Sequence, residues 1–247
     1  MSELTCRPGM KLITGSTPVD PNNKIAPFCI DETEVIQGVF WADVASSFHV
    51  VEKDCKSGAW IVKDIKKTRL EALSALKVAK VDGKHGCDAK VRGPFSESKL
   101  VRRKIDGGNR GDFKPMIYVN WRDAKAYCES RGGSLPTSNQ WEKAARGPKG
   151  LVYGTKSGDL KLEEANYMCL GSAQAPVDVA SYEANAYGLY DMTGNVWEWV
   201  LDGGKDWGIR GGSWYADRMQ ELRADYRGRQ AEKGSFEIGF RCVMSPS

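Results

Sequence analysis

Cysteine and histidine are the residues best suited to metal or redox chemistry, and this chain has seven cysteines and two histidines. No two cysteines form a CxxC pair, which argues against a zinc knuckle or a thioredoxin-like motif. Because seven is odd, at least one thiol is free or pairs with another chain. Several disulfides would indicate an oxidising compartment, whereas buried thiols would suit the cytosol, and the sequence leaves both open. The cysteines are Cys6, Cys29, Cys55, Cys87, Cys128, Cys169 and Cys242.

The two histidines, His49 and His85, cannot form a three-histidine iron site within one chain. A site of two histidines and one carboxylate stays formally open. The glycine pairs at 107–108 and 203–204 do not lie between a strand and a helix in the spacing of a dinucleotide or phosphate loop, so they predict no nucleotide site. Nothing in the pattern supports a Ser-His-Asp triad.

The composition is that of one globular domain. The 247 residues suffice for one sizeable core, and the net charge of +4 is too small to indicate nucleic acid binding. No apolar stretch is long enough for a transmembrane helix, and residues 1–10 lack the apolar core of a signal peptide. We expect export or display at a cell or virion surface if the cysteines are oxidised, and a cytoplasmic location if they are reduced.

The clearest local signals predict two helices. Asn120 is a good N-cap for a helix that runs to about Ser130 and ends at the glycines 132–133. Thr137 and Gln140 form a capping box for a second helix that ends near Arg146. Residues 116–119 form a short apolar run typical of a strand. Within the basic, Gly-rich stretch 48–111 we expect a strand at 59–62 and a short helix at 65–81.

Six blocks resemble the formylglycine-generating-enzyme family. They are VNWRDAKAYC at 119–128, GSLPT at 133–137, QWEKAARG at 140–147, YGLYDMTGNVWEW at 187–199, RGGSW at 210–214 and IGFRC at 238–242. The resemblance implies an α+β, C-type lectin-like fold that is loop-rich, with small antiparallel sheets and two main helices. We therefore predict a single domain over 1–247 with an insertion at about 50–111. Segments 116–119, 196–200 and 239–243 should share one sheet region, and a bend is expected at the glycines 211–212.

The same resemblance bears on catalysis. Oxidases of this family bind copper(I) through two cysteines that follow the RGGS block, because soft thiolates suit that ion. Residues 214–227 contain no cysteine, and Met219 alone cannot replace two thiolates. We therefore predict that the chain is not an enzyme. The alternative is a formylglycine-generating or related metal-dependent oxidase or oxygenase.

The resemblance also implies a structural calcium site and a disulfide. The calcium ligands would be the side chains of Asp191 and Glu198 and the carbonyls of Gly194 and Val196, which are hard oxygen donors. The alternative is that Asp191 caps a turn and Glu198 pairs with an arginine. The disulfide would join Cys128 to Cys242, and Cys55 and Cys87 are a second candidate pair.

The last candidate site is the segment between the RGGSW and IGFRC blocks. It is similar to the C-terminal variable region of proteins diversified by retroelements, which display side chains on a fixed backbone. We predict a non-catalytic module that binds a protein or cell-surface ligand through this segment, without nucleic acid or a membrane span. The alternative is that its apolar side chains pack inward. The predicted contact residues are Tyr215, Asp217, Met219, Asp225, Gln230 and Phe236.

Overall fold

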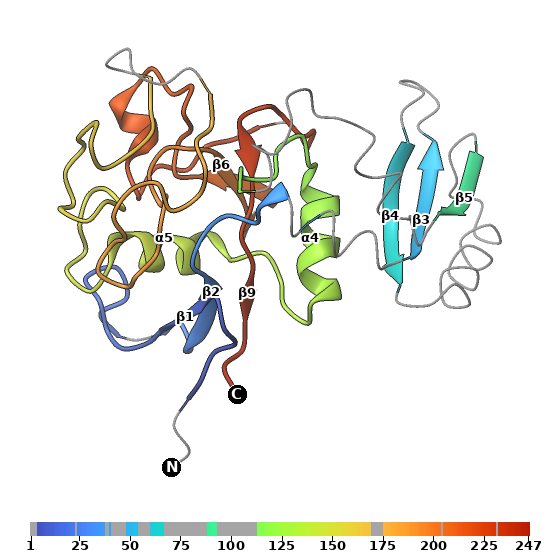
Figure 1. Cartoon of the computed structure of the whole chain (residues 1–247). Coiled ribbons are helices and arrows are strands. Elements are labelled where there is room, and N and C mark those ends of the chain that lie inside the picture. The colour runs from blue at the N-terminus through green and yellow to red at the C-terminus, as the bar shows by residue number, and fades with distance from the viewer. Residues whose placement is uncertain are drawn as a thin grey trace.

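The computed structural model describes residues 4–22, 24–37, 40, 48–53, 60–66, 88–92, 113–168, 175–203, 205–230 and 232–247. These residues form two α-helices and three small three-stranded sheets connected by long loops (Figure 1). The α+β, loop-rich fold class predicted from the sequence is confirmed. No helix in these ranges has the length and apolarity needed to cross a bilayer.

The two predicted helices are present where their caps placed them. Helix α4 spans Trp121–Ser130, and the Asn120 side chain accepts a hydrogen bond from the Asp123 N–H. Helix α5 spans Ser138–Arg146 and begins with the complete capping box of Thr137 and Gln140. The buried face of α4 comprises Trp121, Ala124, Tyr127 and Cys128, and that of α5 is centred on Trp141.

Two of the sheets carry the framework of the domain. In the first, β1 (Met10–Ile13) and β9 (Val243–Met244) both pair antiparallel with β2 (Phe28–Asp31). In the second, β6 (Trp197–Asp202) pairs antiparallel with β7 (Lys205–Arg210) and parallel with β8 (Ile238–Gly239). One strand pair is therefore parallel, where the sequence predicted antiparallel sheets throughout.

Strand β6 lies between two apolar clusters. Trp197 and Trp199, on alternate positions, are both buried against the α4 side with Tyr127 and Phe240. Val200 lies in the second cluster, which packs Trp141 of α5 against β1 and β2. The alternation of a strand thus lets one short segment join the two halves of the core.

The expectation of one common sheet region was wrong in two places. Residues 116–119 form no strand, because Tyr118 adopts φ 58° and the chain bonds first to Val35 and then to Ser235. The segment 239–243 splits, since β8 pairs with β6 whereas β9 pairs with β2. The bend at Gly211 and Gly212 is confirmed, with φ values of 95° and 74°.

The third sheet lies within the stretch interpreted as an insertion. Strand β3 (Phe48–Lys53) pairs antiparallel with β4 (Trp60–Lys66) and β5 (Asp88–Arg92), and β4 lies beside α4 (Figure 1). The strand expected at 59–62 is therefore present from residue 60, and residue 59 lies outside the described ranges. The helix expected at 65–81 is wrong at its start, because residues 65–66 belong to β4. Its remaining residues, together with His85, Cys55, Cys87 and Cys169, lie outside the described ranges.

Two disulfides join cysteines of the described ranges. Cys128 of α4 is bonded to Cys242, as the resemblance implied, and closes a loop of sequence separation 114. Cys6 is bonded to Cys29 of β2 across a separation of 23. The second bridge was not predicted. The first ties the end of a helix to the end of the chain, where it constrains the unfolded state most strongly.

Candidate functional site

The segment between β7 and β8 is held from below by Arg210. This guanidinium is buried, and it donates hydrogen bonds to the Glu142 carboxylate at 2.6 Å and to the carbonyls of Asp225 and Tyr226 at 3.1 and 2.7 Å. At Gly212, an added Cβ would lie 2.6 Å from the Leu222 side chain. Leu222 is itself fully buried. The loop therefore packs tightly on its base, and its backbone is fixed by the framework.

Three aromatic rings gather on the outer side of this segment. Trp214, Tyr215 and Phe236, which we call the aromatic triad, have pairwise centroid distances of 5.4, 5.8 and 5.6 Å and steep interplanar angles. The exposed fractions of Tyr215 and Phe236 are 49% and 38%. The expected exposure of these two side chains is thus observed. Two segments more than twenty residues apart in sequence build one apolar surface.

Carboxylates accompany the aromatic triad. Asp217 is exposed, Glu221 is half-buried, and Glu237 directly follows Phe236. The Ser213 hydroxyl donates a 2.7 Å hydrogen bond to Glu237 and accepts one from the Tyr215 N–H at 3.2 Å, which connects the two chain segments. Burial and the charges of Asp217 and Glu237 raise the pKa of the Glu221 carboxyl, and Arg218 opposes this shift only in part. The three carboxylates and the guanidinium of Arg218 together therefore carry an excess of negative charge.

Among the six predicted contact residues, the described contacts join Tyr215 and Phe236 directly. Met219 lies in the 3-10 turn Met219–Leu222 and is 50% exposed. Asp225 instead accepts two hydrogen bonds from Arg223, at 2.9 and 2.7 Å. The Gln230 carbonyl accepts a hydrogen bond from the Trp207 indole. The described contacts therefore bring Tyr215 and Phe236 together and tie Asp225 and Gln230 to other neighbours.

The predicted contact residues left out four residues at or beside this surface. Trp214 was assigned to the framework because it ends the RGGSW block, yet it is only partly buried and packs on Tyr215 and Phe236. Neither Glu221 nor Glu237 was among the predicted contact residues, since no local pattern shows that residues so far apart meet. Tyr118 is 70% exposed, and its N–H bonds to the Ser235 carbonyl beside Phe236. The strand wrongly expected at 116–119 concealed this exposed tyrosine.

The second candidate site, the calcium loop, is dominated by an ion pair. Glu198 is buried and accepts hydrogen bonds from both Arg241 and Trp141 at 2.6–2.7 Å. Both of its oxygens are therefore engaged. This is the arginine pairing that the sequence analysis gave as the alternative to a metal-ligand role.

Asp191 lies near a carboxyl that sequence reasoning missed, that of Glu34. The Asp191 carboxylate accepts a 2.7 Å hydrogen bond from the Ala180 N–H, and burial raises the pKa of Asp191 to about 6. Burial and the charge of Asp191 raise the pKa of Glu34 well above its ordinary value. Glu34 accepts one hydrogen bond from Asn195, and a hydrogen bond between the Glu34 and Asp191 side chains opposes part of the rise in the pKa of Asp191.

This buried cluster fits calcium by charge and only partly by its donors. Three carboxyls, those of Glu34, Asp191 and Glu198, face one guanidinium, so a cation or a shared proton must balance them. In the described ranges, no three Asp, Glu, His or Cys side chains converge as metal ligands. A calcium ion would therefore depend on the carbonyls of Gly194 and Val196 as well as on the carboxylates.

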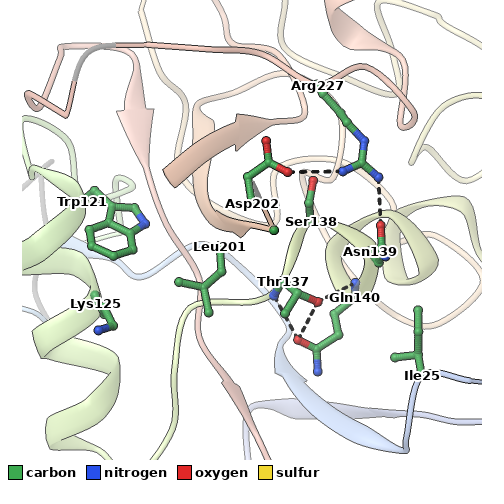
Figure 2. Close-up of a pocket in the computed structure, with 11 residues that line it drawn as sticks. Ile25, Trp121, Lys125, Thr137, Ser138, Asn139, Gln140, Leu201, Asp202 and Arg227 are labelled. Carbon is green, nitrogen blue, oxygen red and sulfur yellow. Dashed lines mark hydrogen bonds and ion pairs between the residues drawn. The ribbon is translucent and has the colours of Figure 1, made fainter. Parts of the chain in front are cut away.

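An open pocket of about 980 Å³ lies between α4 and α5 (Figure 2). Its polar groups are already engaged within the chain. Arg227 donates a hydrogen bond to Asn139 at 2.8 Å and pairs with Asp202 at 3.5 Å, and Gln140 serves the capping box of α5. Lys125 pairs with Glu129. These contacts leave the pocket with few polar groups directed at a ligand, so we assign no ligand to this pocket.

Comparison with known proteins decides the family. Residues 7–246 match the family model of the sulfatase-modifying factor enzyme 1-like domain. The chain belongs to the sulfatase-modifying factor enzyme 1-like family. Similar members include the inactive C-alpha-formylglycine-generating enzyme 2 of Mus musculus, 31% identical over 90% of this chain and 76% of that protein. The formylglycine-generating enzyme of Streptomyces coelicolor is 30% identical over 76% of this chain and 61% of that enzyme.

Solved structures confirm the fold of this family member. Treponema denticola variable protein 1 superposes with a TM-score of 0.59 at 17% identity, covering 96% of this chain and 95% of that one. CarF superposes with a TM-score of 0.53 at 21% identity, covering 99% and 95%. At these identities the likeness establishes the architecture. The family thus has members named as enzymes and members named as inactive, and the residues of the site must decide which of the two this chain resembles.

Proposed function

We propose that this family member is a non-catalytic binding module whose ligand, a protein or cell-surface molecule, contacts the segment between β7 and β8. The observation that carries the proposal is the exposed aromatic triad on a buried framework. Exposed aromatic rings that contact one another are costly in water and typical of binding surfaces. The predicted contact residues remain Tyr215, Asp217, Met219, Asp225, Gln230 and Phe236, with Trp214 added from its position in the triad.

The donor set of the same segment supports the non-catalytic part of the proposal. Residues 214–229 contain no cysteine. The stretch to which the resemblance assigns a pair of copper-binding thiolates holds instead Trp214 and Tyr215 of the aromatic triad, together with carboxylates that include Asp217 and Glu221. Hard carboxylates and aromatic rings are poor ligands for copper(I), which prefers thiolates.

The enzymatic alternative is tested directly. Purified protein is incubated with copper(I), oxygen and a cysteine-containing sulfatase-type peptide, and formylglycine is sought by mass spectrometry. We expect no conversion, while a cysteine-bearing oxidase of the family serves as positive control. Detectable turnover that scales with protein concentration would overturn the non-catalytic assignment.

The binding surface is tested with matched variants. Surface-exposed partners are captured from source cells with the wild-type protein, with the triple variant Tyr215→Ala/Asp217→Ala/Phe236→Ala, and with the control Leu4→Ala/Glu129→Gln. The control residues are exposed and lie at the terminus and on α4. We expect the triple variant alone to lose the captured partner. Equal capture by all three proteins would contradict the proposed surface.

We also propose that calcium binds beside Asp191 in a structural role. The support is the excess of buried carboxyls over guanidinium groups described above. Calcium would favour the ionised form of Asp191 and remove the cost of burying that charge.

A further inference from the structure

The aromatic triad and the carboxylates beside it suit one kind of ligand group. We propose that they bind an arginine or lysine side chain presented by a partner protein. The inference rests on the proposed binding function and specifies the chemistry of the partner. The faces of Trp, Tyr and Phe rings attract cations, and the attraction grows when the cation is partly removed from water.

The charges around the triad favour a cation over an apolar or anionic ligand. Glu221 interacts electrostatically with the carboxylates of Asp217 and Glu237 and with the guanidinium of Arg218. Arg218 reaches Asp217 only at 3.9 Å, and both side chains are more than 70% exposed. Such an exposed pair is weak. The surface therefore keeps a local negative charge that a basic side chain would neutralise.

This negative charge is local, because the chain as a whole carries +4. The overall charge repels a basic ligand at long range, so the attraction must come from the surface around the triad. Burial is the main cause of the raised pKa of the Glu221 carboxyl, and the like charges of Asp217 and Glu237 add to it. Placing these carboxylates near one another does not stabilise the folded state, whereas it would strengthen the binding of a cation.

The triad is also rigid enough to serve as an anchor. Ser213, at its base, is fully buried and bonds to Glu237, and Ala216 and Leu222 below it are buried. The three rings contact each other at 5.4–5.8 Å, which limits their rotation. A side chain that lands on them therefore meets a surface that is already formed, at low entropic cost.

The test measures binding of a fluorescein-labelled hexa-arginine peptide by anisotropy at low ionic strength. We expect the wild-type protein to bind it, and to bind hexa-lysine more weakly because guanidinium stacks on rings. The variants Tyr215→Ala/Phe236→Ala and Asp217→Asn/Glu221→Gln should each weaken binding about tenfold. The control Leu4→Ala/Glu129→Gln should bind like wild type, and thermal melts should show that all variants are folded.

Several outcomes would overturn the inference. They are no binding of hexa-arginine, equal binding by the variants and the wild type, or equal binding of hexa-glutamate. Tighter binding of tetramethylammonium than of the peptide would show that the preferred ligand is a small quaternary cation and would overturn the assignment to a basic protein side chain. Loss of partner capture by the triple variant without hexa-arginine binding would refute the cationic ligand and keep the binding module. Formylglycine production would refute the non-catalytic binding module, but it would not change the outcome of the hexa-arginine binding assay.

Discussion

The framework and the surface segment differ in how their charges are balanced. In the framework, three buried cations each pair with a carboxylate: Arg241 with Glu198, Arg210 with Glu142, and Lys143 with Asp20. The neighbouring carboxyls of Glu34 and Asp191 are the exception, and burial raises the pKa of both. Around the aromatic triad, like charges lie near one another and the rings face water. Burial requires pairing, because an unpaired buried charge costs several kcal/mol. The surface segment is under no such requirement, so its residues are better explained by a ligand than by folding.

The largest expected effect concerns the disulfide of the framework. Replacing Cys128 and Cys242 together by Ala should lower the free energy of unfolding by about 5 kcal/mol, since the bridge closes a long loop. The disulfide between Cys6 and Cys29 closes a shorter loop, so the matched variant Cys6→Ala/Cys29→Ala should lose only about 3 kcal/mol of the free energy of unfolding. Urea denaturation measures both. The reverse order of the two costs would contradict the chain-entropy explanation.

The next effect breaks the buried ion pair. Arg241→Met should destabilise the protein by about 3–5 kcal/mol, because it leaves Glu198 buried without its cation near two further carboxyls. Adding Glu198→Gln in the same chain should recover part of the loss. Chemical denaturation of the single and double variants measures this coupling. A double variant less stable than Arg241→Met would show that the pair is not the dominant interaction.

The buried carboxyls should make stability depend on pH. The pKa of Asp191 is about 6 in the folded state, against an ordinary value of 3.8, so the folded state holds its proton more tightly. The contribution of Asp191 to the free energy of unfolding should therefore be greatest below about pH 4 and fall by up to about 3 kcal/mol as pH rises through about 6. Glu34 acts in the same direction. Denaturation in a chelator across this range, with Asp191→Asn as a flatter control, checks the sign.

Calcium should reverse part of that loss. At about pH 7.5, millimolar calcium should raise the melting temperature by several degrees, and a chelator should lower it again, because the ion stabilises ionised Asp191. Magnesium, which demands a tighter octahedral site, is the control ion. If the melting temperature is the same in calcium and in chelator, and the Asp191→Ala variant melts at the same temperature as the wild type, the calcium proposal is wrong. Protons would then balance the buried carboxyls.

The smallest effect on stability belongs to the surface segment. The triple variant Tyr215→Ala/Asp217→Ala/Phe236→Ala should change the free energy of unfolding by only about 0.5 kcal/mol per residue, as exposed side chains usually do. A Trp199→Ala variant, which empties the core, should cost about 3–5 kcal/mol. Thermal and urea denaturation compare the two. A large loss in the triple variant would place these residues in the core and end the contrast drawn above.

The sequence predicted those parts of the fold that depend on neighbouring residues. Asn120 and Thr137 act within three residues of themselves, so both helix starts were correct. The split between β8 and β9 and the left-handed turn at Tyr118 depend on contacts with distant segments, and no local pattern shows them.

The candidate sites divide in the same way. The exposure of Tyr215 and Phe236 followed from their place between two buried blocks. Their contact with each other, and the meeting of Glu221 with Glu237, arise only once the chain is folded. Glu34 was missed for this reason also, since its neighbours Asp191 and Asn195 lie more than 150 residues away.

The two ends of the described chain are joined to each other. Thr5 and Ser247 exchange two backbone hydrogen bonds, and Figure 1 shows both ends on the same side of the molecule. A short linker could therefore connect them, and new ends could be opened at an exposed loop, to give a circularly permuted domain. In the same way, a carrier fused at either end would emerge from one point, which makes the fold suitable for tethering to a bead or a phage coat.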